Sequence, residues 1–204
     1  MSRVMSYILN MIPYMIIALP VIILIRVISC STMKRREVKT TTWHEIGFCL
    51  FAMFLVGLFS QTIIPKLDFG VGGVGITNGN LVGEINLIPG KVFVDTWRES
   101  IYGGYWLNFI INFIGNICLF VPIGFCVPLL WHKQSFRKTI LVGLLISLFI
   151  ELCQLPQARG TDIDDLWINT LGTVCGYWLY VGSCNFLSGF LLKFRVQNGN
   201  RNFE

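Results

Sequence analysis

Ionisable and amide side chains gather in one short segment of a chain that is otherwise apolar. The segment ELCQLPQARGTDIDDLWINTLG, residues 151–172, places Glu151 in an apolar run. The turn that follows contains Arg159, Asp162, Asp164 and Asp165. Carboxylates can act as general acids or bases, and an arginine can bind a phosphate or a carboxylate. Each group is costly to desolvate, so their grouping indicates a shared polar site.

Glu151 lies near the end of its apolar run. At 1.5 Å per residue it is about 7 Å from the helix end, and Gln154 shares its helix face. An ionisable group inside a membrane span usually faces the bundle interior or a water-filled cavity. Two interpretations remain open: Glu151 is a functional group, or it is protonated and only holds helices together.

An amide stripe precedes this segment. Asn108, Asn112 and Asn116 follow an i, i+4, i+8 spacing, so they lie on one helix face. Such amides can hydrogen-bond between helices for about 0.6 kcal/mol each. The stripe therefore either packs helices together or lines the same pocket as Glu151.

The turn before the last apolar run allows two interpretations as well. In the first, Asp162 and Asp165 form an acidic helix N-terminus, where unpaired N–H groups stabilise carboxylates. In the second, the turn is part of a functional site, because one cap would suffice and does not require three aspartates beside an arginine. Asp165 and Asn169 are i, i+4 neighbours and point into the same region. Gly172 and Gly176 continue this face and predict close helix packing.

The elements that position these residues are membrane helices. Of the 204 residues, 54% are apolar and 13% are charged, whereas a soluble domain carries about 25% charged residues. A hydrocarbon core of about 30 Å needs roughly 20 helical residues. Five spans are predicted, over residues 4–28, 44–64, 105–131, 139–156 and 166–187.

We expect an all-α, polytopic membrane bundle that forms a single domain over residues 1–204. The long connection 65–104 is Gly-rich in its first half, where a loop is expected. Its second half, KVFVDTWRESIYG, places Val92, Phe93, Trp97 and Ile101 near one helical face. This pattern predicts an amphipathic helix in the membrane interface.

The basic residues predict the orientation. With the N-terminus outside, eleven Lys and Arg residues lie on the cytoplasmic side and five on the outer side. The connection 65–104 and the turn after Glu151 are then outside, and the C-terminus is cytoplasmic. The net charge of +5 sits beside apolar runs, so it indicates lipid contacts and not nucleic acid.

The cysteines and histidines do not indicate a metal site. Seven cysteines occur without a C-x-x-C motif, which favours buried free thiols over a disulfide framework or a zinc site. His44 and His132 are interpreted as boundary residues at the cytoplasmic interface. No cofactor and no resident metal are expected.

The ordered set of motifs resembles the VanZ-like family over about residues 84–182. The set comprises NLIP (86–89), NFIGNICLFVPIG (112–124), ELCQ (151–154) and RGTDIDDLWINTLGTVCG (159–176). The family often has an aromatic residue after NLIP, where Gly90 stands here. The first two apolar runs match only as generic helices.

The resemblance implies a small multi-pass protein of the Gram-positive plasma membrane, and thus of the cell envelope. The family's namesake is associated with resistance to the lipoglycopeptide antibiotic teicoplanin. The resemblance supplies no catalytic role for any residue. The family's recurring polar residues correspond here to Asn112, Asn116, Glu151, Gln154, Arg159, Asp162, Asp165 and Asn169.

Two hypotheses of function follow. In the first, the protein binds a lipoglycopeptide or a cell-wall precursor lipid in an outward-facing polar pocket, with membrane lipids around it. In the second, it is an enzyme acting on a lipid-linked substrate such as a polyprenyl phosphate. Glu151 would then be the acid or base, and Asp162 and Asp165 would hold a divalent cation or position a nucleophile.

Overall fold

Helices make up the architecture of the computed structural model, which describes residues 3–35, 38–63, 67–70, 73–76, 85–86, 88–103, 106–131, 135–155, 161–195 and 197–198. The helices are α1 (Arg3–Arg35), α2 (Thr42–Thr62), α3 (Lys91–Gly103), α4 (Trp106–Leu130), α5 (Phe136–Gln154), α6 (Ile163–Phe186), α7 (Ser188–Leu191) and the 3₁₀ turn η1 (Leu192–Phe194). An all-α fold class was predicted, and the helical architecture agrees with it.

Three short strand pairs accompany the helices. β1 (Val38–Lys39) pairs antiparallel with β6 (Gln197–Asn198). In the Gly-rich part of the 65–104 connection, β2 (Leu67–Gly70) pairs antiparallel with β3 (Gly73–Ile76), where a loop was expected. β4 (Ile85–Asn86) pairs parallel with β5 (Thr161–Asp162).

Three helices in the described part of the chain are long and apolar enough to cross a membrane. They are Leu9–Cys30, Thr42–Thr62 and Phe113–Leu130, so the chain is a helical membrane protein. Helices also occupy the other two predicted ranges, as α5 and α6. α5 carries Arg137, Lys138 and Glu151 within 19 residues, which makes it less apolar than the other three. The count of five spans therefore stays a prediction.

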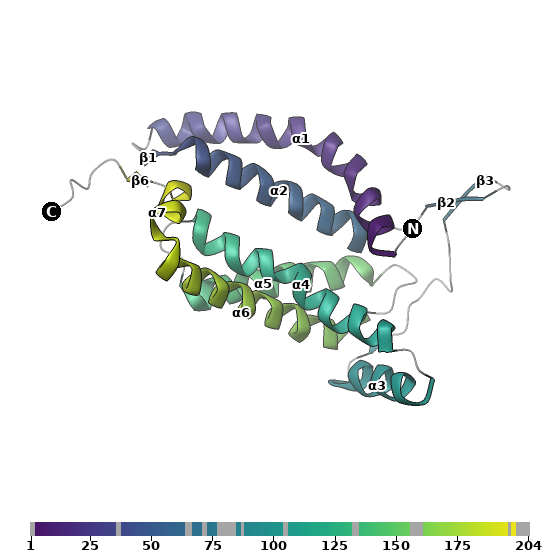
Figure 1. The fold of residues 1–204 in the computed structure, drawn as a ribbon. Coiled ribbons are helices and arrows are strands. Elements are labelled where there is room, and N and C mark those ends of the chain that lie inside the picture. The colour runs from purple at the N-terminus through teal and green to yellow at the C-terminus, as the bar shows by residue number, and fades with distance from the viewer. Residues whose placement is uncertain are drawn as a thin grey trace.

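The helices form two layers. α1 and α2 lie side by side in one layer, and α4, α5 and α6 form the second (Figure 1). Large apolar side chains of α2, α4 and α5 fill the space where the layers meet. The buried members of this core are Phe51, Leu58, Phe120, Ile123, Val127, Leu130 and Ile150.

The backbones of α4 and α6 approach each other at glycines. A Cβ atom added at Gly176 would lie 2.1 Å from the carbonyl oxygen of Val121, and one at Gly172 would lie 2.3 Å from that of Ile117. From the other helix, a Cβ atom at Gly124 would lie 2.0 Å from the carbonyl oxygen of Thr173. The close packing predicted for Gly172 and Gly176 is thus confirmed.

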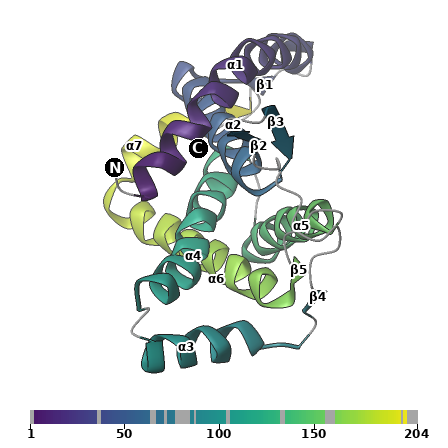
Figure 2. The same cartoon turned by 90° about the vertical axis from the view of Figure 1, so that its right-hand side faces the viewer.

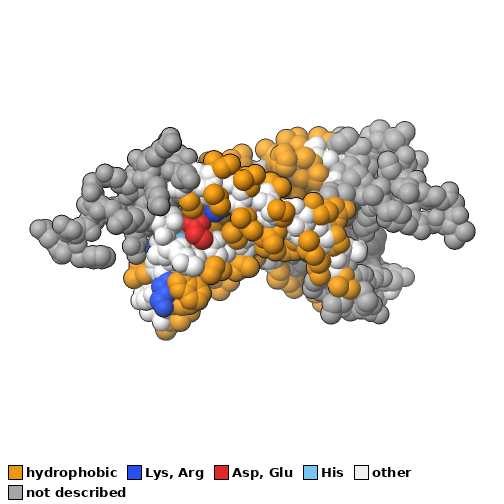
Figure 3. All heavy atoms as spheres, turned by 90° about the horizontal axis from the view of Figure 1, so that it is seen from above, with side chains coloured by type: hydrophobic (Ala, Val, Ile, Leu, Met, Phe, Trp, Pro, Cys, Tyr) orange, Lys and Arg blue, Asp and Glu red, His pale blue; other side chains and the backbone are white. Residues whose placement is uncertain are grey.

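The outer surface of the first layer is apolar. Large hydrophobic side chains of α1, among them Ile16, Ile17 and Leu24, are exposed. Hydrophobic side chains also cover much of the described part of the face seen in Figure 3. Because exposed apolar surface on this scale is unfavourable in water, these helices contact membrane lipids.

α3 is the helix predicted within the 65–104 connection, and it lies at the end of α4 and α6 near β4 and β5 (Figure 2). The Phe93 ring packs against Phe113, with ring centroids 5.7 Å apart, while Trp97 and Ile101 are exposed. The helix itself is therefore present. Its position in the membrane interface stays a prediction.

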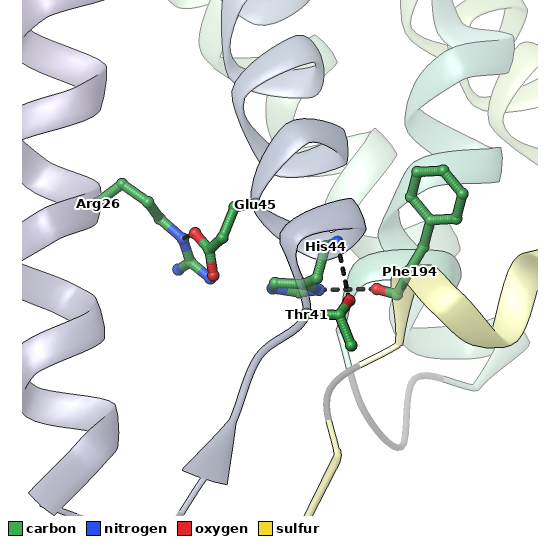
Figure 4. A network of polar contacts seen from close by, with 5 residues as sticks. All are labelled: Arg26, Thr41, His44, Glu45 and Phe194. Atoms are coloured by element: carbon green, nitrogen blue, oxygen red, sulfur yellow. Dashed lines mark hydrogen bonds and ion pairs between the residues drawn. The ribbon is translucent and has the colours of Figure 1, made fainter.

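An ion pair links the two helices of the first layer near the opposite end of the bundle. Arg26 of α1 donates to both carboxylate oxygens of Glu45 on α2, and its Nη2–Oε1 distance is 3.0 Å (Figure 4). The guanidinium carbon also lies 4.4 Å from the centroid of the Phe48 ring. This pair was not predicted, because the two residues are 19 positions apart on different helices.

His44 was interpreted as a boundary residue at the cytoplasmic interface, and in the structure it also makes a specific hydrogen bond. It is buried, and its Nδ1 lies 2.7 Å from the carbonyl oxygen of Phe194, so Nδ1 donates to that carbonyl (Figure 4). His132 lies outside the described residues. All seven cysteines are free thiols, but Cys118 and Cys175 are exposed, which corrects the prediction that the thiols are buried.

Candidate functional site: a polar cluster at the start of α6

Six polar side chains meet where α6 begins, and we call them the polar cluster. They come from β4, α4, α5, β5 and the first turn of α6, so segments far apart in the sequence build the site. The members are Asn86, Asn116, Glu151, Asp162, Asp164 and Asp165.

Glu151 joins α5 to the start of α6. Its side chain is only 6% exposed, and its Oε2 accepts a hydrogen bond of 3.1 Å from the backbone N–H of Asp162. A buried carboxylate needs such a donor, because its desolvation is otherwise unfavourable. Glu151 therefore connects α5 to the residue that caps α6.

Asp162 is the N-cap of α6. Its Oδ1 accepts 2.9 Å from the backbone N–H of Asp164, as the capping interpretation predicted. The same oxygen accepts 3.1 Å from the Asn86 side-chain amide. This second contact follows from the parallel pairing of β4 with β5, in which Asn86 is the register partner of Asp162.

Asp164 is the most deeply buried member of the cluster, and the sequence analysis did not select it. It is 0% exposed, and its Oδ1 accepts 2.6 Å from the backbone N–H of Gly90 and 2.9 Å from Nε1 of Trp167. The signal that could have found it is the NLIP segment, whose loop returns to this carboxylate. Asn86 was likewise missed as a site residue.

Gly90 fits this loop for a conformational reason. Its φ angle is +82°, a backbone region that residues with a Cβ atom rarely adopt. In this conformation its N–H reaches Asp164, and α3 begins at the next residue. A glycine where the family often has an aromatic residue is therefore consistent with the local geometry.

Asp165 contacts the amide stripe on α4. Its Oδ1 accepts 2.9 Å from Nδ2 of Asn116, so the predicted approach of these two segments occurs. Burial and the nearby Asp162 carboxylate raise the pKa of Asp165 from 3.8 to about 6, while the hydrogen bond from Asn116 opposes the shift and Asp164 adds to it.

Two predicted site residues lie beside the cluster. Asn169, one helical turn beyond Asp165, donates 2.9 Å to the hydroxyl of Ser147 on α5, and both side chains are buried. Gln154 donates 2.9 Å to the carbonyl oxygen of Thr62 at the end of α2. These amides join helices, as the packing interpretation of such groups expects.

Two further predicted site residues are not described. The Asn112 side chain and the whole of Arg159 lie outside the described part of the structure. Their contribution to the site stays a prediction.

The cluster is rich in carboxylates. Among the described residues, one oxygen of each of the Glu151, Asp162 and Asp165 carboxylates accepts the hydrogen bonds given above. Within the described ranges, no group of three or more His, Cys, Asp or Glu side chains could hold a metal ion. The arrangement can accept hydrogen bonds and protons, and Asn86 and Asn116 show how an amide donor binds to it.

These features define a helical integral membrane protein with a polar cluster at one end of its bundle. A family model described as VanZ/LLP1 matches residues 46–188, a range that includes every member of the cluster. The match covers well over half of the chain, and the chain therefore belongs to the VanZ/LLP1 family. Comparison with curated proteins finds no match, and comparison with solved structures finds none either.

Proposed function

We propose that this VanZ-like membrane protein lowers susceptibility to teicoplanin-type lipoglycopeptides. It does so by binding the drug, or the cell-wall lipid that the drug targets, in an outward-facing pocket at the polar cluster. The observation that carries the proposal is the convergence of Asn116, Glu151 and Asp165 at the start of α6, because these residues belong to three separate motifs of the family resemblance.

The chemistry of the cluster supports this proposal. Carboxylate oxygens of Glu151 and Asp165 would accept hydrogen bonds from amide or amine groups of the drug. Arg159, which precedes β5 in the sequence, would pair with a phosphate of the lipid or a carboxylate of the drug. The apolar surfaces of the neighbouring helices suit an acyl or prenyl chain.

The proposal is tested by expressing the gene in a susceptible Gram-positive host and measuring its resistance to teicoplanin. The intact gene should confer resistance. The triple variant Glu151→Gln, Arg159→Ala and Asp165→Asn removes three charges and should return teicoplanin susceptibility to the level of the empty vector. The amount of protein in the membrane is measured in parallel. If resistance survives all three substitutions at unchanged abundance, the pocket hypothesis is wrong.

A matched control exists on α3. Asp95→Asn and Arg98→Ala make the same types of change at exposed positions outside the cluster. This double variant should keep the resistance of the intact protein. Resistance lost equally in both variants would indicate a general charge effect and would contradict the proposal.

Binding can be measured directly on the detergent-purified protein. A ligand that binds only the folded form raises its thermal unfolding midpoint. We expect teicoplanin or precursor lipid to raise the midpoint of the intact protein but not that of the triple variant. Polyprenyl phosphate and divalent ions complete the panel, and no shift with any compound at saturation would count against the proposal.

The alternative function is an enzyme that acts on a lipid-linked substrate. The raised pKa of Asp165 favours this candidate, because a carboxylic acid that holds its proton near pH 6 can deliver it to a substrate. Purified protein would then turn over a polyprenyl phosphate or precursor lipid, with loss of turnover in Asp165→Asn and in Glu151→Gln. Binding without turnover would leave the first proposal in place.

A further inference from the structure

A second feature of the molecule lies at the end of the bundle opposite the polar cluster. There the chain leaves α6 and folds as α7 and η1 against the first turn of α2 (Figure 1). The Thr41 hydroxyl donates to the carbonyl oxygen of Lys193. His44 donates to the carbonyl oxygen of Phe194 (Figure 4). The turn is therefore held by its backbone carbonyls and by the buried Leu191 side chain, while the side chains of Phe190, Leu192 and Lys193 are exposed.

Three aromatic rings form the base of this turn. Trp43 of α2 lies 6.0 Å from Phe190 and 5.7 Å from Phe194, measured between ring centroids, and the two phenylalanines are 5.2 Å apart. The Lys193 ammonium lies 6.0 Å from the centroid of the Trp43 ring, and the Lys193 side chain is exposed. A cation is thus positioned next to an aromatic surface.

Exposed apolar side chains belong to the same segment of the chain as this cation. Phe186 is 88% exposed, and Leu187, Phe190 and Leu192 are exposed as well. In water these side chains would be unfavourable, but at a membrane surface they can enter the acyl region while a lysine reaches the headgroups. The position of Trp43 agrees with this depth, because tryptophan is enriched at membrane interfaces.

More positive charge lies nearby at the start of α5. Arg195 donates to the Tyr180 hydroxyl, the Tyr180 ring contacts Tyr177, and the Tyr177 ring lies 5.1 Å from Phe136. The next residues of the chain, 137 and 138, are an exposed Arg and an exposed Lys. This series of aromatic contacts connects the α7–η1 turn to Arg137 and Lys138. The turn and these two basic residues therefore belong to the same end of the bundle.

We infer that this end carries a binding site for an anionic phospholipid. Lys193 pairs with the phosphate of the headgroup, supported by Arg137 and Lys138, and the acyl chains lie against Phe190 and Leu192. Charge complementarity selects an anionic lipid over a zwitterionic one, since basic residues near a membrane surface attract anionic headgroups. This site is separate from the polar cluster and does not rest on the function proposed for it.

The test compares lipids on the full-length protein in detergent. Phosphatidylglycerol should raise the thermal unfolding midpoint more than phosphatidylcholine at equal concentration, and inorganic phosphate should not raise it. Lys193→Gln should remove at least half of the difference between the two lipids, whereas Lys193→Arg should keep it. Equal shifts with both lipids, or an equal shift with inorganic phosphate, would overturn the lipid site.

The control variant is Lys91→Gln, which removes an exposed lysine at the other end of the molecule, on α3. It should keep the full preference for phosphatidylglycerol. Preference lost equally in Lys91→Gln and Lys193→Gln would overturn the inference, because net charge would then explain the effect. Counting phosphatidylglycerol molecules retained by each variant in native mass spectrometry gives a readout that does not depend on unfolding, and equal retention in both would likewise contradict the site.

Discussion

At the scale of single residues, the raised pKa of Asp165 predicts how the stability of the protein depends on pH. Its pKa is raised to about 6, so the folded protein holds this proton more tightly than the unfolded chain does. The stability that the protonated group contributes is complete below about pH 4 and is lost as the pH rises to about 6. Asp165→Asn keeps an oxygen acceptor for Asn116 and removes the charge. The variant's unfolding midpoint should therefore fall less than that of the intact protein between pH 4 and pH 7.

Thermal unfolding in detergent over this pH range checks the prediction. Asp95→Asn, at an exposed position on α3, is the matched control and should follow the intact protein. Parallel curves for Asp165→Asn and the intact protein would show that Asp165 does not titrate in this window.

The ion pair between Arg26 and Glu45 leads to a second prediction, which concerns the stability of variants that lack it. The two side chains are 11% and 28% exposed, so they lie between a surface pair and a buried pair. Arg26→Met removes the cation that pairs with the Glu45 carboxylate. The expected loss of stability exceeds the roughly 1 kcal/mol of an exposed pair and approaches the loss for a buried pair, which is about 3–5 kcal/mol.

The double variant Arg26→Met and Glu45→Met provides the comparison. It removes both charges and fills the site with apolar atoms, so it should be more stable than Arg26→Met alone. Unfolding in detergent measures all three proteins. If the double variant is the least stable, the pair is not what holds α1 against α2.

At the scale of elements, the close contact between α4 and α6 depends on glycines, which have no side chain to separate the helices. Gly176→Ala would place a methyl group 2.1 Å from the carbonyl oxygen of Val121, which forces the helices apart and should cost about 1–3 kcal/mol. Gly182 lies on the same helix with nothing within 4 Å of its added Cβ atom. Gly182→Ala should therefore stabilise the protein, by about 0.5–1 kcal/mol, because alanine is the better helix former. Opposite signs in the two unfolding measurements are expected, and equal signs would contradict this packing.

The elements themselves could be predicted from local sequence. Apolar runs predicted a helix in each of the five ranges, and the small-residue spacing of Gly172 and Gly176 predicted where two of them meet. The contacts between Asn116 and Asp165 and between Glu151 and the start of α6 also follow from motifs placed at one end of a bundle. Each of these inferences needs only the spacing within one segment and the length of a membrane span.

What could not be predicted depends on distant segments. Asp164 is the most deeply buried carboxylate of the cluster, and the Gly90 loop folds back on it. Asn86 joins the site because β4 pairs with β5. Arg26 finds Glu45 only once α1 and α2 pack together. No periodicity within one helix reports such contacts, since they are set by how the elements approach each other in space.

At the scale of the whole molecule, the remaining prediction is orientation. The excess of basic residues at the end that carries α7 predicts a cytoplasmic C-terminus. A green fluorescent protein fused to the C-terminus should therefore fluoresce, and alkaline phosphatase fused at the same place should be inactive. The reverse result would place the polar cluster on the cytoplasmic side, where a lipoglycopeptide does not act, and would exclude the proposed function.

The attachment of η1 to α2 also has a consequence for biosynthesis. Thr41 and His44 leave the ribosome early, but the carbonyl groups they bind belong to residues 193 and 194 of a 204-residue chain. The pair of helices α1 and α2 must therefore exist with these donors unpaired or hydrated while about 150 further residues are translated. The contact between η1 and α2 can thus form only after the helices of both layers have been made.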